Sequence, residues 1–228
     1  MVPEATSGEA AASYRPRPDG RRSRAPTESA GNGRGAQGAR TRRRLLDAGI
    51  RAFAERGYHA SRVDDIARGA AMSHGTFYLY FSNKQALLHA LASECAAELC
   101  KLPGSIGSVD PGPSGYAVVR DFVARFVSLY RRFGPVIRVW MEGEIDDRAL
   151  EREGRAAFVE IATTLRRRML DAGIARQQAT ARSAALMALL ERFSYGLASG
   201  RRIGSSEPRA LDDLARFVHR GFFGAAAT

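Results

Sequence analysis

Residues 61–88 read SRVDDIARGAAMSHGTFYLYFSNKQALL, and this stretch decides the fold of the N-terminal part of the chain. Apolar residues recur at helical spacing from 63 to 70 and again from 77 to 81. Ser61 and Asp64 resemble a capping box at the start of the first helix, and Ser73 is a suitable N-cap for the second. The stretch therefore predicts two short helices joined by a tight turn, which is the helix-turn-helix.

The second predicted helix begins with small and polar residues suited to DNA bases. A helix-turn-helix lays this helix in the major groove, where base edges offer hydrogen-bond donors and acceptors. Ser73, His74 and Thr76 match those groups, and Gly75 allows close approach of the backbone. His74 is alternatively no more than a polar residue at a helix start. Four other side chains are suited to phosphate oxygens, which position a protein on DNA. They are Arg62, Tyr78, Tyr80 and Lys84.

Longer helices are predicted on both sides of this pair. An apolar face runs from Arg40 to Gly57, and a glycine is favoured at the left-handed position that ends a helix. Ser82 and Gln85 form a second capping box, followed by a helix to about residue 101. We therefore expect a three- to four-helix DNA-binding domain over residues 38–101.

The run Ser73-x-Gly75-Thr76-x-Tyr78-x-Tyr80-Phe81, followed by Lys84, resembles the DNA-binding signature of the TetR family of regulators. The resemblance covers residues 40–88, and the rest of the chain is similar in layout only. It implies a bacterial homodimer that binds a double-stranded DNA operator and a small-molecule effector, with no cofactor.

The chain departs from the family pattern at Ala71, where the family usually has glycine. If this turn position needs a positive φ, alanine costs about 1 kcal/mol relative to glycine. Gly69, inside the short first helix of the pair, weakens that helix by a similar amount. We expect a helix-turn-helix that is less rigid than is usual in the family.

The C-terminal part also shows only helical periodicity. Residues 102–115 are rich in Pro, Gly and Ser and predict a loop at a domain boundary. Helices are then predicted over residues 116–133, ended by Gly134 and Pro135, and over residues 146–173, 177–199 and 208–223. No alternating strand pattern is present, so the sequence predicts an all-α fold with a second helical domain over 102–228.

By the resemblance, a cavity between C-terminal helices binds the effector and couples it to the spacing of the two DNA-binding domains. The large apolar residues of these helices are the pocket candidates, and their character favours a hydrophobic or amphipathic effector. The alternative is that they only form the core. The candidates are Phe122, Phe126, Trp140, Met141, Phe158, Met169, Met187, Leu190 and Phe193.

The family layout also pairs helices near 177–199 and 207–223 with their twofold mates in a four-helix dimer interface. Small residues permit close approach there. They are Ala181, Ala184, Ala185 and Ala188. The alternative is packing of these helices within one subunit only.

The net charge of +11 and the pI near 10.5 favour a polyanionic partner, which is nucleic acid, an anionic membrane surface or an acidic protein. Residues 1–37 are rich in Gly, Pro, Ala, Ser and Arg and predict a disordered basic tail. The tail either enters a flanking minor groove or is an inert extension.

The cysteines and the hydropathy pattern place the protein in the cytoplasm. Cys95 and Cys100 form neither a disulfide framework nor a metal-ligand set, and the histidines are scattered. No apolar run approaches the roughly 18 to 20 residues of a membrane span, and the N-terminus has no secretory signal core. We expect no metal, no membrane span and no export.

The leading function is repression, in which a dimer occupies a palindromic operator and effector binding shifts the population to a form that no longer fits. Alternatives are an activator of the same family, a nucleic-acid-directed enzyme and an adaptor that binds DNA nonspecifically. We find no activated nucleophile or paired catalytic carboxylates and predict no enzyme activity. An acidic cluster at the start of the helix over 146–173 looks like a solvated helix junction and not a catalytic site. Its residues are Glu142, Glu144, Asp146 and Asp147.

Overall fold

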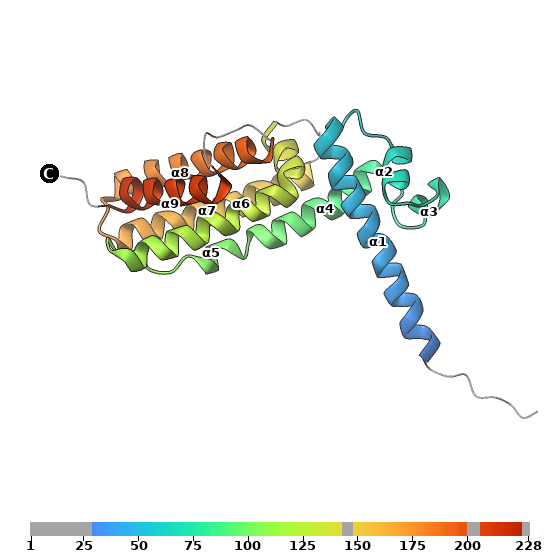
Figure 1. The fold of residues 1–228 in the computed structure, drawn as a ribbon, viewed down its shortest axis with the longest axis horizontal. Coiled ribbons are helices and arrows are strands. Elements are labelled where there is room, and N and C mark those ends of the chain that lie inside the picture. Colours follow the sequence, from blue (N-terminus) through green and yellow to red (C-terminus); the bar gives the residue numbers. More distant parts are fainter. Residues whose placement is uncertain (1–28, 143–147, 200–205, 225–228) are drawn as a thin grey trace, which may run out of the picture. The chain divides into compact units, whose positions relative to one another are not determined.

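The computed structural model describes residues 29–142, 148–199 and 206–224, and all regular structure in these ranges is helical (Figure 1). The prediction of an all-α fold is confirmed. The helices are α1 (Ser29–Arg56), α2 (Val63–Gly69), α3 (His74–Tyr78), α4 (Lys84–Leu99), α5 (Leu102–Ser105), α6 (Pro113–Glu142), α7 (Arg148–Asp171), α8 (Arg176–Ala198) and α9 (Glu207–Val218), and a π-helical turn, η1, follows at His219–Phe223.

The first helix begins earlier than predicted. The expected tail extended to residue 37, but α1 starts at Ser29. Several glycines between residues 31 and 38 disfavour a helix, each by about 1 kcal/mol relative to alanine. Extension of an existing helix needs no new nucleus, however, so α1 continues through them. Residues 1–28 of the predicted tail lie outside the described ranges. The described residues up to Gly38 belong to a different unit from those that begin at Ala39, and the contacts below belong to the second unit.

The junction between α1 and α2 corrects one predicted cap. Gly57 has φ +77° and its N–H donates to the Phe53 carbonyl at 3.0 Å, as expected for the end of α1. Ser61 does not cap α2. Its buried hydroxyl donates to the carbonyl oxygens of Ala52 at 3.0 Å and Gly57 at 2.7 Å, because the end of α1 offers unpaired acceptors. Arg62 holds the N-cap position, and its side chain makes no capping hydrogen bond.

Two further boundaries differ from the prediction. Asn83 rather than Ser82 caps α4, since its side-chain oxygen accepts from the Ala86 N–H at 2.7 Å. Helix α6 does not end at Gly134 and Pro135 but continues to Glu142. Buried neighbours on this helix supply packing that offsets the hydrogen bond that Pro135 cannot make. Part of the predicted loop after residue 101 is the short helix α5.

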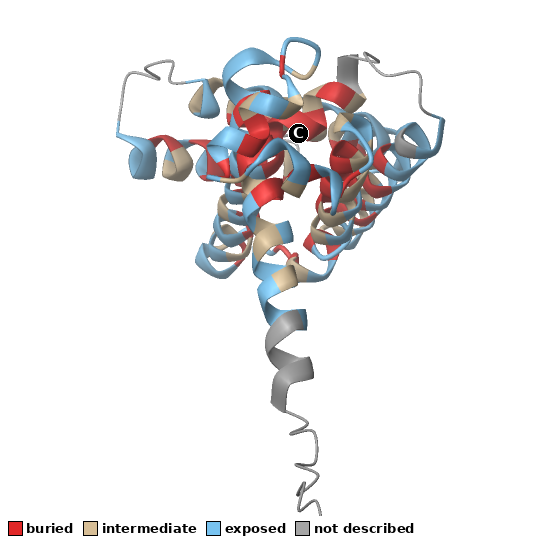
Figure 2. Cartoon of the chain, turned by 90° about the vertical axis from the view of Figure 1, so that its right-hand side faces the viewer, coloured by how far each residue is buried: buried red, intermediate tan, exposed pale blue. Residues whose placement is uncertain are grey.

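One continuous core connects the described helices from residue 45 to residue 223. Helix α6 packs against α4, α8 and α9, while α7 packs against α4 and α8. Buried residues line the facing sides of these helices (Figure 2). Because α4 contacts both α6 and α7, it joins the helix-turn-helix region to the C-terminal bundle.

Candidate functional site

The N-terminus of α3 presents small polar groups to solvent. Ser73 is its N-cap, and the Ser73 Oγ accepts from the Thr76 N–H at 3.1 Å. The same oxygen lies 2.8 Å from the Thr76 Oγ1. Ser73, His74 and Gly75 are exposed and Thr76 is half-buried. The predicted cap is confirmed, and four of the candidate DNA-binding residues lie together at one helix end.

His74 is held by neighbours on both helices of the pair. Its Nε2 lies 3.3 Å from the Asp64 Oδ1 of α2, and its ring makes an edge contact with Tyr78 at 4.9 Å between centroids. The side chain remains 56% exposed. Gly75 is not required for packing, since an added Cβ would meet only the Ser73 Oγ at 3.9 Å. The open space there leaves room for a close partner.

The aromatic residues of α3 and its C-terminal end divide between core and surface. Phe77 and Phe81 are buried and pack 5.8 Å apart, whereas Tyr78 is 49% exposed and Tyr80 is half-buried. Leu79 is 82% exposed beside Tyr78 and was not among the predicted site residues. Leu79 is two residues from each buried phenylalanine, and on a helix this spacing places a side chain on the opposite face, so the sequence could have indicated its exposure.

The turn between α2 and α3 requires the conformation expected at Ala71. Ala71 has φ 55°, so the positive φ on which the expected strain depends is confirmed. Its N–H donates to the Arg68 carbonyl at 2.9 Å, and the Met72 N–H donates to the Ala67 carbonyl at 2.9 Å. These two bonds are those of a Schellman motif, which favours glycine at the left-handed residue.

Arginine side chains of α1 hold the end of α2. The Arg44 Nη2 donates to the Ala70 carbonyl at 2.7 Å, and the Arg51 Nη2 donates to the Gly69 carbonyl at 3.0 Å. Cations are favoured at helix C-termini, so both side chains stabilise the position of α2 next to the turn.

Lys84 binds the protein backbone. Its Nζ donates to the carbonyl oxygens of Tyr58, His59 and Ser61 at 2.7, 3.2 and 2.9 Å, and it lies over the Tyr58 ring. Burial lowers the pKa of Lys84. An ammonium group has three N–H donors, and all three are directed to carbonyls. The geometry favours a role in positioning the 58–61 loop over a phosphate contact. Arg62 is exposed.

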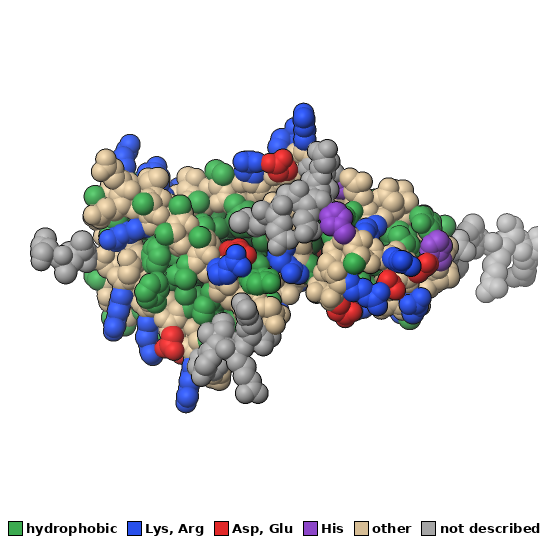
Figure 3. Space-filling view, turned by 90° about the horizontal axis from the view of Figure 1, so that it is seen from above, with side chains coloured by type: hydrophobic (Ala, Val, Ile, Leu, Met, Phe, Trp, Pro, Cys, Tyr) green, Lys and Arg blue, Asp and Glu red, His purple; other side chains and the backbone are tan. Residues whose placement is uncertain are grey.

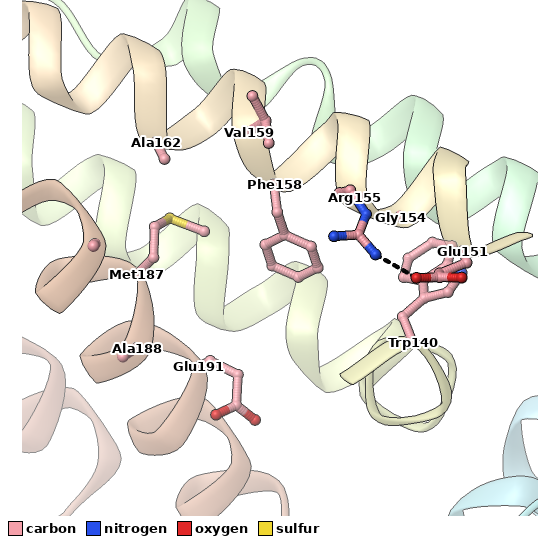
Figure 4. Close-up of a pocket in the computed structure, with 11 residues that line it drawn as sticks. Trp140, Glu151, Gly154, Arg155, Phe158, Val159, Ala162, Met187, Ala188 and Glu191 are labelled. Carbon is pink, nitrogen blue, oxygen red and sulfur yellow. Dashed lines mark hydrogen bonds and ion pairs between the residues drawn. The ribbon is translucent and has the colours of Figure 1, made fainter. Parts of the chain in front are cut away.

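A cavity of about 510 Å³ lies between α6, α7 and α8 (Figure 4). Three predicted pocket residues line it, namely Trp140, Phe158 and Met187. Its other lining residues are Glu151, Gly154, Arg155, Val159, Ala162, Ala184, Ala188 and Glu191.

The remaining pocket candidates lie elsewhere. Phe122, Phe126, Met169 and Leu190 are at most 1% exposed in the core, and none of them lines the cavity. Phe193 is half-buried and packs against the core, also outside the lining. The Met141 side chain lies outside the described residues.

Gly154 and Glu191 line the cavity but were not among the predicted site residues. A Cβ on residue 154 would lie 2.6 Å from the Trp140 Cδ2, so the indole ring needs glycine there. The Glu191 Oε1 accepts from the Tyr130 hydroxyl at 3.1 Å. Burial, together with the Glu191 charge, raises the pKa of Tyr130, which keeps the hydroxyl protonated as a donor. A single glycine on α7 and a single glutamate on α8 are not distinctive in the sequence, so no sequence pattern marks either residue as part of a cavity.

Hydrophobic groups gather on one face of the C-terminal helices (Figure 3). The small residues expected at the dimer interface, Ala181, Ala184, Ala185 and Ala188, are all exposed on α8. Phe217 on α9 is 60% exposed and makes an edge contact with Phe222 at 6.1 Å.

The described ranges contain no cluster of three or more His, Cys, Asp or Glu side chains arranged to hold a metal ion. Cys95 is buried and Cys100 is exposed, and neither forms a disulfide. None of the helices in residues 29–142, 148–199 and 206–224 combines the length and apolar character needed to cross a bilayer. Of the acidic cluster predicted as a helix junction, residues 143–147 lie outside the described ranges.

Comparison with known proteins identifies the N-terminal domain. Residues 45–91 match the family model "Bacterial regulatory proteins, tetR family". The "Fatty acid metabolism regulator protein" of Bacillus subtilis is 46% identical over 50 residues, which are 22% of this chain and 26% of that protein. The match therefore spans about a quarter of that relative's length. The "HTH-type transcriptional repressor AcnR" of Corynebacterium diphtheriae is 30% identical over 132 residues, 52% of this chain and 66% of that protein.

The structural comparison extends over most of the fold. The transcriptional regulator FadR from Bacillus subtilis, solved in complex with stearoyl-CoA, matches with a TM-score of 0.55. The match covers 80% of this chain and 98% of that chain at 17% identity. At this identity the likeness shows the fold, an N-terminal helix-turn-helix followed by a helical C-terminal domain. The family model at residues 45–91 identifies the N-terminal domain of this chain as a DNA-binding domain of the tetR family of bacterial regulatory proteins.

Proposed function

We propose that this protein is a DNA-binding transcription regulator that places α3 in the major groove of an operator. The exposed N-terminus of α3 within the family's domain carries the proposal. Ser73, His74, Gly75 and Thr76 contact base edges, because they lie together at the end that enters the groove. Arg62, Tyr78 and Tyr80 contact phosphate oxygens and set the register on DNA.

The protein acts as a homodimer. The exposed alanines of α8 and the exposed Phe217 of α9 support this assignment, because each helix presents apolar side chains to solvent on the single chain. Pairing of α8 and α9 with their twofold mates buries these side chains in a four-helix interface. Residues 38–101 form the DNA-binding domain and residues 102–228 the effector and dimerisation domain. The twofold axis gives the operator its palindromic form.

The regulator is a repressor that a small molecule releases from DNA. One relative bears the name of a repressor, and a structural neighbour was solved with an acyl-CoA. In this chain the cavity between α6, α7 and α8 is large enough for a small organic effector and is mostly apolar. Its apolar walls favour a hydrophobic or amphipathic effector. The protein works in the cytoplasm, where bacterial DNA is found.

Selection of bound sequences from random double-stranded DNA tests this function with the full-length protein. We expect enrichment of a palindrome whose half-sites lie about one helical turn, or a multiple of it, apart. Binding to that palindrome should exceed binding to scrambled DNA by about 10³-fold or more at physiological salt. Salt-sensitive binding without sequence preference would instead identify a nonspecific DNA adaptor.

A further inference from the structure

The charged side chains that line the α6–α7–α8 cavity differ in how far they are exposed to solvent. Glu151 and Arg155 are one helical turn apart on α7, form an ion pair and are both more than half exposed (Figure 4). Glu191 on α8 is only 15% exposed. The described lining residues thus contain two carboxylates and one guanidinium group, which is already paired. Glu191 therefore gives the cavity its net negative character.

The described contacts of Glu191 include no cation within hydrogen-bond distance of its carboxylate. Its Oε1 accepts from the neutral Tyr130 hydroxyl, and its Oε2 lies 4.0 Å from the Arg192 Nε. Arg192 is 76% exposed and lies over the Tyr195 ring, so solvent screens its charge. Arg138 is half-buried, lies 5.6 Å from the centroid of the same ring and exerts its charge on the Tyr130 hydroxyl, but no direct contact with Glu191 is described. A largely buried carboxylate is stabilised much more by a cation in direct contact than by an exposed arginine.

The other residues that line the cavity are suited to a ligand with an apolar body and a positive charge. Phe158 on α7 and Met187 on α8 extend into the same space from facing helices, and Trp140 closes one end against Gly154 (Figure 4). Aromatic rings attract cations through their electron-rich faces. Val159 is 58% exposed, so the cavity is open to solvent on the α7 side.

We propose that the cavity takes an amphipathic organic cation, whose charged group lies against the Glu191 carboxylate and whose apolar body lies between Phe158, Met187 and Trp140. This inference rests on the proposed function, in which the cavity is the effector site. It separates this chain from the structural neighbour solved with stearoyl-CoA, a polyanion. The only guanidinium group of the described lining is engaged by Glu151 and does not form an anion site.

A pair of probe ions with the same shape and opposite charge tests the ligand class. Tetraphenylphosphonium and tetraphenylborate are rigid, apolar and closely matched in size. The chain contains a single tryptophan, Trp140, which lines the cavity, so its fluorescence reports occupancy directly. We expect saturable quenching by the cation at concentrations at least about tenfold lower than by the anion, which corresponds to about 1.4 kcal/mol. The protein's net charge of +11 favours the anion, so nonspecific attraction works against this result.

Substitutions test whether Glu191 causes the preference of the cavity for the cation. Glu191→Gln keeps an acceptor for Tyr130 and should weaken cation binding about tenfold while leaving anion binding unchanged. Glu151→Gln is the matched control, because it removes an exposed carboxylate of the same lining and should change cation affinity far less. If Glu191→Gln fails to fold, Glu191→Asp replaces it, and we expect intermediate cation affinity from the shorter side chain. Equal or tighter binding of the borate, or unchanged cation affinity in the Glu191 variant, would overturn the proposal.

The DNA selection separates this inference from the function on which it rests. Selection of a palindrome by a protein that does not bind tetraphenylphosphonium would overturn the ligand class and leave the regulator function standing. Charge-selective cation binding through Glu191 by a protein that selects no sequence would overturn the regulator function and support the cation site.

Discussion

Ala71 holds φ 55° in the turn between α2 and α3, a conformation that costs a residue with a Cβ about 1 to 2 kcal/mol. Ala71→Gly removes this strain, although the added freedom of glycine in the unfolded chain offsets part of the gain. We predict that the free energy of unfolding rises by about 0.5 to 1 kcal/mol, measured by chemical denaturation.

Ala70→Gly is the matched control for this substitution. Ala70 precedes the strained residue, has φ −88° and is buried, so glycine there gains nothing and loses a packed methyl group. It should destabilise the protein. A loss of stability in Ala71→Gly as well would show that the strain at residue 71 is negligible.

His74 lies at the exposed end of α3 and is held by Asp64 and Tyr78. We predict that His74→Ala changes the base preferred at one position of each half-site, as measured by repeated selection from random DNA. Because phosphate contacts remain, the dependence of affinity on salt should keep its slope. Arg62→Ala is the control and should weaken all sequences alike. A uniform loss in His74→Ala would assign this residue to the backbone instead.

At the scale of elements, the helices were predictable from periodicity but several of their ends were not. Ser73 caps α3 as predicted, because its Oγ accepts from the Thr76 N–H three residues later. The predictions for Ser61 and Pro135 were wrong. The buried Ser61 hydroxyl binds a carbonyl of α1 instead of capping α2, and packing around α6 keeps this helix continuous through Pro135. Likewise Phe126 and Phe158 look alike in sequence. Only the packing of the helices places the first in the core and the second in the cavity.

Lys84 connects α4 to the 58–61 loop, and this role yields a prediction for stability. Lys84→Met keeps most of the apolar stem but removes three hydrogen bonds to backbone carbonyls. We expect the free energy of unfolding to fall by about 1 to 3 kcal/mol in denaturant titrations. Lys101→Met, at an exposed lysine that pairs with Glu98 one turn earlier, should change the free energy of unfolding by less than about 0.5 kcal/mol. Unchanged stability with weaker DNA binding and a smaller salt slope would restore the phosphate role of Lys84.

At the scale of the whole molecule, α4 is the physical connection between DNA-binding and C-terminal elements. Glu94 on α4 lies 2.6 Å from the Arg43 Nη1 of α1 and 3.5 Å from the Arg132 Nη2 of α6. Hydrogen bonds to Asp47 and Glu94 raise the pKa of Arg43, so its charge is constant at all working pH values. One carboxylate on α4 thus bridges an arginine of α1 and an arginine of α6. Sequence alone gave no indication of this, because the three residues are far apart along the chain.

The proposed dimer interface on α8 and α9 yields the last prediction, for which Ala185 is the best position. It is exposed on α8 among the small residues but, unlike Ala184 and Ala188, it does not line the cavity. In an isologous interface Ala185→Glu places two carboxylates close to the twofold axis, where they are desolvated and repel each other. We expect sedimentation to show a shift from dimer to monomer, while tryptophan fluorescence still reports probe binding in the cavity. Operator affinity should fall about 10² to 10⁴-fold, because the two half-sites are then bound independently.

Ala97→Glu is the control for this substitution. It introduces the same charge at an exposed alanine of α4 and should leave the protein dimeric. A dimer that survives Ala185→Glu would place the interface on another face of the chain.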